Sequence, residues 1–168
     1  MVTRNWYNYF KSMRAEQVFS NAITEWSGSK NSAGWRYNGN FDSVINFKNV
    51  AFYLSNSNNG IVVGSGRTPA TIDDYKLESM ITSGLSASIA KSIDSDNDTI
   101  IALTFTNTSS ADITIGEIGY VGTVYIDNNF GGSKYVLLER TVLDSPVTIP
   151  AGGIGKIEYS IKLNIPEA

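Results

Sequence analysis

The chain has 168 residues, of which 42% are hydrophobic and 17% charged, and its formal net charge is −3. This length and composition suffice to bury the core of one domain. The sequence contains no cysteine and no histidine. Disulfides, the usual zinc sites, and serine or cysteine catalysis through a histidine base are therefore excluded.

Charge and hydropathy also bear on partners and location. The only local basic group is Arg4, Lys11 and Arg14, which we interpret as a solvated helix face, so no nucleic-acid partner is expected. No stretch approaches the roughly 20 apolar residues of a membrane helix. The first residues lack the apolar run and cleavage site of a secretory signal. We expect no membrane partner and synthesis in the cytoplasm.

Residues 3–19 are predicted to form a helix. Trp6, Tyr9, Phe10 and Met13 recur at three- and four-residue spacing and would line one face. The ordinary role of such a stripe is to pack on the protein's own sheet. Exposed aromatic clusters also favour subunit interfaces. As candidate partner-binding residues we select Trp6, Tyr7, Tyr9 and Phe10.

Residues 20–60 are rich in Asn, Ser and Gly, with short apolar pieces between them. The piece at 50–54 is a candidate strand. Asn59-Gly60 is a strong hairpin signal, so residues 61–63 are predicted to return beside it. The glycine-rich loop at 64–69 lacks the Gly-Lys-Ser/Thr ending of a phosphate loop. We interpret it as a turn, followed at 73–78 by one helical turn or an irregular crossing.

From Leu85 onward the sequence predicts regular strands. Alternating apolar residues indicate strands at 85–93, 101–106, 113–118, 120–126, 135–138, 141–143 and 157–163, with a hairpin joining the first two. Residues 107–112, 127–132 and 150–153 are predicted turns or loops. Short strands at about ten-residue spacing favour a sandwich or a barrel, and we expect an antiparallel β-sandwich, jelly-roll or Ig-like. We expect an N-terminal helix or arm at 1–20 and a single mainly-β domain at 21–168.

Three groups of residues are candidates for chemistry. The triplet Asp94, Asp96 and Asp98 alternates like the start of a calcium loop, but Thr99 and Phe105 stand where that loop needs glycine and a bidentate acid. An acidic turn is the default there, with a strand-loop calcium site as the weaker alternative. No cofactor is expected.

The other two candidate groups are carboxylates in predicted strands and aromatic residues in an Asn- and Gly-rich region. Glycosidases need two carboxylates flanking a cleft, yet the spacing of Glu117, Glu139 and Glu158 favours no pair. No catalytic residue is therefore predicted. The aromatic residues Trp26, Trp35, Tyr37 and Phe41 suit sugar stacking or an interface, although core packing is the simpler explanation.

Three blocks of the sequence are considered together: Val2-Thr-Arg-Asn-Trp-Tyr7, the segment 62–77, and a third block at 105–108, 115–119, 138–153 and 161–166. Together they resemble a family of small structural proteins of tailed bacteriophages of the gut-phage type. The resemblance covers nearly the whole chain and carries no catalytic signature. It implies a virion component with a β-sandwich core: a capsid decoration protein, a head-fibre or collar piece, or a tail component.

The resemblance implies a non-enzymatic protein that docks on other phage structural proteins of the capsid, neck or tail, and is made in the host cytoplasm. It also implies a homo-oligomer, with a trimer as one form. The alternative function is a module that binds host glycan. A polysaccharide-degrading enzyme is the third alternative.

Overall fold

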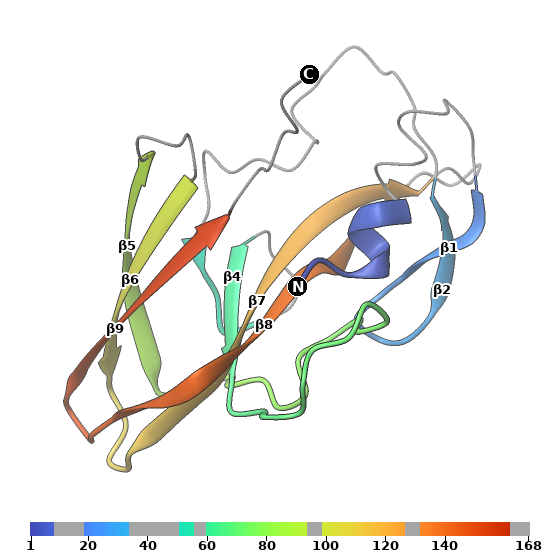
Figure 1. Ribbon diagram of the computed structural model, residues 1–168. Coiled ribbons are helices and arrows are strands. Elements are labelled where there is room, and N and C mark those ends of the chain that lie inside the picture. The colour runs from blue at the N-terminus through green and yellow to red at the C-terminus, as the bar shows by residue number, and fades with distance from the viewer. Residues whose placement is uncertain (9–18, 34–50, 56–59, 94–98, 127–131, 162–168) are drawn as a thin grey trace. The chain divides into compact units, whose positions relative to one another are not determined.

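The computed structural model describes residues 1–8, 19–33, 51–55, 60–93, 99–126 and 132–161 (Figure 1). Within these ranges the chain is mainly β and its sheets are largely antiparallel, which confirms the predicted fold class. The jelly-roll or Ig-like type stays a prediction. The strands are β1 (Phe19–Thr24), β2 (Lys30–Ala33), β3 (Ala51–Phe52), β4 (Gly60–Gly64), β5 (Leu85–Ile93), β6 (Thr99–Asn107), β7 (Ile113–Ile126), β8 (Gly132–Ile149) and β9 (Ile154–Ile161).

The chain groups into two compact units. The first contains Met1–Thr82 and Ile115–Pro146, and the second contains Ser83–Thr114 and Val147–Ala168. Strands β7 and β8 each contribute residues to both units. The predicted division at residue 20 stays a prediction.

The first unit is built on a four-stranded sheet with the order β3-β4-β7-β8, accompanied by the β1–β2 pair. All five residues of β4 are buried, as expected of a central strand covered on both faces. Val62 of β4 joins Leu77, Val121 and Leu137 in a core cluster, against which Trp26 and Met80 pack. Gly119 belongs here because a Cβ would lie 2.8 Å from Leu137 Cδ1 and 2.9 Å from Leu77 Cδ2.

The predicted hairpin at Asn59-Gly60 is wrong. Strands β3 and β4 pair in parallel, with Ala51 beside Gly60 and Phe52 beside Ile61. Gly60 is buried and already pairs with Val121 of β7, so it is the first residue of a strand and not part of a turn. The turn propensity of Asn-Gly is overridden by burial of the strand that follows.

The N-terminal segment begins as an added edge strand. Thr3 N–H donates to Leu138 O at 2.9 Å, and Arg140 N–H donates to Met1 O at 3.0 Å, so residues 1–3 run antiparallel to β8. Helix follows at residues 4–8, the short coil beside β8 in Figure 1. The rest of the predicted helix lies outside the described residues up to Phe19, where β1 begins.

The second unit contains a regular antiparallel sheet with the order β5-β6-β9 (Figure 1). Leu85, Ile101, Leu103, Phe105 and Ile157 form buried positions on alternate residues, as the sequence pattern predicts. The predicted hairpin of β5 and β6 and the turn at 150–153 are confirmed. Among the described residues, Tyr159 Oη is buried without a hydrogen-bond partner.

Asn107 holds the connection between β6 and β7. Its side-chain amide donates to Ala111 O at 2.8 Å and to Ile149 O at 2.9 Å, while its Oδ1 accepts from Ser109. The side chain is almost fully buried. One asparagine therefore satisfies backbone groups of the β6–β7 connection and the buried carbonyl of Ile149.

Candidate functional site

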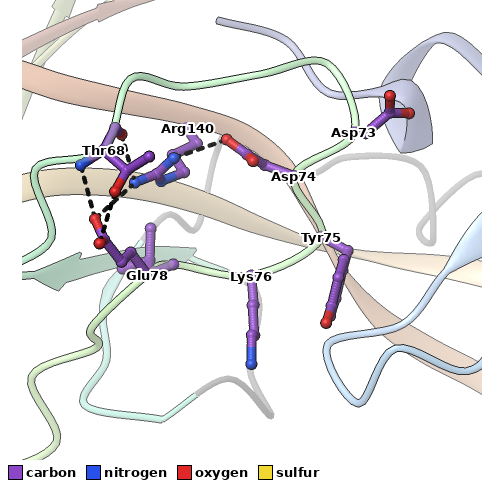
Figure 2. Close-up of a pocket in the computed structure, with 8 residues that line it drawn as sticks. Thr68, Asp73, Asp74, Tyr75, Lys76, Glu78 and Arg140 are labelled. Atoms are coloured by element: carbon purple, nitrogen blue, oxygen red, sulfur yellow. Dashed lines mark hydrogen bonds and ion pairs between the residues drawn. The ribbon is translucent and has the colours of Figure 1, made fainter.

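A cavity of about 240 Å³ in the first unit is the best candidate for a chemically organised site. It lies over the loop between β4 and β5, at residues 65–80, and over one residue of β8. Figure 2 shows the polar side chains that surround it. The lining residues are Thr68, Asp73, Asp74, Tyr75, Lys76, Leu77, Glu78 and Arg140.

Arg140 is the centre of this arrangement, and only 3% of its side chain is exposed. Its Nε donates to Glu117 Oε2 at 2.7 Å, and Nη1 donates to Asp74 Oδ2 at 2.8 Å. Its Nη2 donates to Thr68 O at 3.1 Å and lies 3.7 Å from Glu78 Oε2. The guanidinium therefore joins β8 to β7 and to two parts of the loop, and Figure 2 shows its contacts with the loop.

Glu117 of β7 lies beneath the loop with no exposed surface. Its Oε1 accepts from Ser79 N–H at 2.8 Å and from Gly66 N–H at 3.2 Å, and its Oε2 accepts from Glu78 N–H at 3.2 Å. With Arg140 these donors surround the carboxylate. A buried charge is tolerated only when it is paired and hydrogen-bonded in this way.

The close approach of Glu117 explains why glycine occupies positions 64 and 66. A Cβ at Gly66 would lie 2.5 Å from Glu117 Oε1, and one at Gly64 would also collide with this carboxylate. Neither glycine has the positive φ of a left-handed turn position. The glycines therefore allow close approach to a buried carboxylate. The sequence, which predicts a turn at 64–69, does not reveal this role.

The acidic groups of the loop are held in their charged forms. Partial burial would raise the pKa of Asp74, but hydrogen bonds from Thr71 and Arg140 outweigh it and lower that pKa. Hydrogen bonds from the backbone and hydroxyl of Thr68, and from Arg67 N–H, lower the pKa of Glu78. For Arg140, burial is outweighed by its bonds to Asp74 and Glu117, so its pKa is raised.

The contacts of Asp74 and Glu78 show that these charged groups hold the loop in place. Asp74 also accepts from Thr71 N–H at 2.8 Å, and Glu78 accepts from Arg67 and Thr68 N–H at 2.7 and 2.8 Å. Among the described residues, no group of three or more carboxylates is placed to hold a metal ion. Within the cavity wall, Thr68, Asp74, Glu78 and Arg140 therefore use polar groups on one another and on the loop backbone.

The three strand carboxylates considered from the sequence have separate contacts. Glu117 is enclosed under the loop, while Glu139 accepts from Met1 N at 3.1 Å and from Thr141 Oγ1 at 3.0 Å. Glu158 is exposed on β9 of the second unit. Sequence reasoning did not select Arg140. The signal it offers is an arginine in a strand, two positions from Leu138 on one side and from Val142 on the other.

Other predicted positions fall partly outside the described residues. This applies to the candidate calcium residues Asp94, Asp96 and Asp98, and to the aromatic residues Trp35, Tyr37 and Phe41. Trp26 is half-buried and packs against the core cluster of the first unit. The simpler explanation, core packing, is correct for Trp26.

The N-terminal segment combines a fixed backbone with exposed apolar side chains. The buried Asn5 donates to Thr24 O at 2.8 Å and accepts from Thr24 N–H at 2.7 Å, and Thr3 Oγ1 donates to Leu137 O at 2.8 Å. Arg4 N–H donates to Ile72 O at 2.6 Å, so the loop lies against this segment. We call its exposed apolar residues the N-terminal surface: Met1, Val2, Tyr7 and Ile72.

The four predicted partner-binding residues differ in exposure and in whether the structure describes them. Tyr7 is 59% exposed and belongs to the N-terminal surface. Trp6 is half-buried. Tyr9 and Phe10 lie outside the described residues.

Comparison of the chain with protein-family models, curated proteins and solved structures finds no match in any of the three. In the part of the chain that the structure describes, no helix has the length and apolar character needed to cross a membrane.

Proposed function

We propose that this chain is a non-enzymatic structural protein of a tailed-bacteriophage virion, which assembles on capsid, neck or tail proteins through protein–protein contacts. The proposal rests on the resemblance of the three sequence blocks and on one structural observation. That observation is the N-terminal surface, where apolar side chains are exposed on a backbone that is already hydrogen-bonded in place.

Exposed apolar residues on a rigid segment suit docking for two reasons. Their burial against a partner removes apolar area from water. Because the backbone of residues 1–3 is bonded to β8 and the side chain of Asn5 is bonded to Thr24, little further ordering is needed when a partner binds. Tyr7 is the preferred central contact, since tyrosine is enriched in the energetically dominant parts of interfaces.

The cavity over loop 65–80 supports a mechanical role for that region. In its wall Arg140 bonds Asp74, and Glu78 bonds the loop backbone. Ile72 of the same loop belongs to the N-terminal surface, and Asp73 of this loop pairs with Arg4. In this proposal the buried ion pair of Arg140 and Glu117 keeps the loop, and hence part of the docking surface, in one conformation.

The experiment is to purify particles by density gradient from a phage-producing culture that encodes this chain. We expect mass spectrometry to find the chain in the particles at a constant ratio to the major capsid protein, and immunogold labelling to place it on head, neck or tail. A chain found only in the soluble fraction would reject the virion proposal.

Two matched tyrosine variants test the docking surface. Tyr7→Ser should lower incorporation into particles while leaving the unfolding midpoint unchanged, because Tyr7 is 59% exposed. Tyr135→Ser changes a tyrosine of β8 that is 37% exposed, and should be incorporated normally. Equal incorporation of both variants and the unmodified protein would exclude Tyr7 as a docking contact.

A further inference from the structure

Strand β9 forms one edge of the sheet in the second unit. It pairs with β6 in an unbroken register from Thr99 beside Ile161 to Thr106 beside Ile154. Among the described residues, no strand pairs with its other side. An open strand edge presents unpaired N–H and C=O groups to any strand that can align with it.

The backbone groups that face this open edge can be identified. Asn107 N–H donates to Gly153 O at 2.9 Å, just beyond the last registered pair of β6 and β9. Because hydrogen-bonding direction alternates along an antiparallel strand, the odd-numbered residues of β9 face β6. The even-numbered residues Ile154, Lys156, Glu158 and Ser160 therefore direct their N–H and C=O groups outward.

The side chains of these four residues are exposed as well. Ile154 is 66% exposed, the largest value among the exposed large apolar residues of the described chain. Lys156 and Glu158 carry opposite charges two positions apart, and neither forms an ion pair with another described residue. The edge thus offers hydrogen-bonding groups and two uncommitted charges of opposite sign.

We propose that β9 pairs antiparallel with β9 of a second copy of this chain, around a two-fold axis at Ile157. In this register Lys156 lies opposite the partner's Glu158, and Glu158 lies opposite the partner's Lys156. Ile154 lies opposite the partner's Ser160. The sheets of the two copies become one sheet of six strands, and the interface is isologous, as two-fold symmetry requires.

Charge complementarity selects a second copy as the occupant. Opposite charges directly across two antiparallel strands stabilise the pairing, and like charges oppose it. The other edge strand of this sheet, Leu85–Ile93, contains Lys91 but no acidic residue, so its pairing with itself gains no opposite-charge contact. The β9 edge is therefore favoured over the β5 edge.

The dimer is expected to be weak. Four residues of each strand exchange backbone hydrogen bonds, and such an edge is small beside the roughly 1,200–2,000 Å² of stable interfaces. We expect a dissociation constant between about 10 µM and about 1 mM. The inference concerns the purified protein and does not depend on the virion proposal, so either one can fail alone.

Sedimentation velocity of the full chain tests the pairing, over concentrations from about 10 µM to about 2 mM. Lys156→Glu places Glu opposite the partner's Glu158 at both symmetric positions, and Glu158→Lys places Lys opposite Lys. Each single variant should weaken the dimer by about tenfold or more. Both changes are at exposed positions, and unchanged thermal unfolding will show that each variant folds.

Mixing provides the decisive measurement. A 1:1 mixture of Lys156→Glu and Glu158→Lys restores opposite charges at both positions, so the heterodimer should regain the affinity of the unmodified protein. The proposal is overturned by an unmodified protein that stays monomeric at about 2 mM, or by one that forms a trimer. It is equally overturned by single variants that dimerise normally, or by a mixture that does not recover.

Discussion

Arg140 and Glu117 are the two residues on which the conformation of loop 65–80 depends. Both are almost fully buried, and between them they bond Gly66, Thr68, Asp74, Glu78 and Ser79. Buried ion pairs add little net stability compared with apolar residues of the same volume, but removal of one partner leaves a desolvated charge without compensation. The effect of substitution is therefore asymmetric.

Replacement of Arg140 by methionine should lower the free energy of unfolding by about 3–5 kcal/mol, because Glu117 then stays buried without its counter-charge. Urea unfolding followed by circular dichroism will measure the loss. If Arg140→Met does not fold, Arg140→Lys serves instead. It keeps the charge but loses the fork of donors that reaches three acceptors, so an intermediate loss is expected.

The matched control is Arg4→Met, which breaks the pair between Arg4 and Asp73. Both of these side chains are more than half exposed, so solvent already screens their attraction and little change in stability is expected. Equal destabilisation by Arg140→Met and Arg4→Met would contradict the role assigned to the buried pair.

At the scale of the element, the stability that loop 65–80 contributes to the fold should decrease in acid. The pKa values of Asp74 and Glu78 are lowered in the folded protein from their ordinary values of 3.8 and 4.5. A group with a lowered folded pKa stabilises the protein above its unfolded pKa, and this contribution is lost as pH falls through the folded value. The thermal midpoint should therefore fall as pH decreases below about 4.

Comparison of two asparagine variants will assign this acid sensitivity to the loop. Asp74→Asn should reduce the decrease of the thermal midpoint between pH 6 and pH 2, since one linked carboxylate is gone. Asp144→Asn, at an exposed aspartate of β8, should leave the slope unchanged. The assignment fails if Asp74→Asn retains the full slope.

Sequence patterns predicted the elements whose side chains alternate. Strands β5, β6 and β9 have apolar residues at every second position, and the register places those residues side by side in one buried face. Strands β1 and β2 were not predicted, since they lie in an Asn- and Ser-rich region with little apolar period. Their pairing depends on tertiary context, including the contact of Thr24 with Asn5.

The candidate site was less accessible to sequence reasoning than the fold. Glu117 was recognised only as a strand carboxylate, and its partners are 23 to 51 residues away along the chain. No local pattern encodes a contact of that range. Gly64 and Gly66 carry the only local signal, because two glycines close together after a buried strand indicate close approach to another group.

At the scale of the whole molecule, two strands connect the two compact units. β7 and β8 each contribute residues to both units. The three tryptophans of the chain, at positions 6, 26 and 35, all belong by sequence number to the first unit. Tryptophan fluorescence therefore reports on the first unit, while far-ultraviolet circular dichroism reports on both.

We expect the urea unfolding curves from fluorescence and from circular dichroism to coincide, because loss of β7 and β8 removes strands from both units together. Curves with separate midpoints would show that the units unfold independently. Arg140→Met should shift both curves to lower urea concentration, although the substitution lies in the first unit.

The distance in sequence between the loop and its buried pair also determines when the loop can close during synthesis. Gly66 and Ser79 leave the ribosome well before Glu117, and Thr68 precedes Arg140 by 72 residues. Such long-range contacts form late, because the chain entropy of closing the intervening segment must be overcome first. A nascent chain that ends before residue 140 therefore holds a loop whose Asp74 and Glu78 carboxylates lack the guanidinium of Arg140. We therefore expect loop 65–80 to close only after Arg140 of β8 has been synthesised.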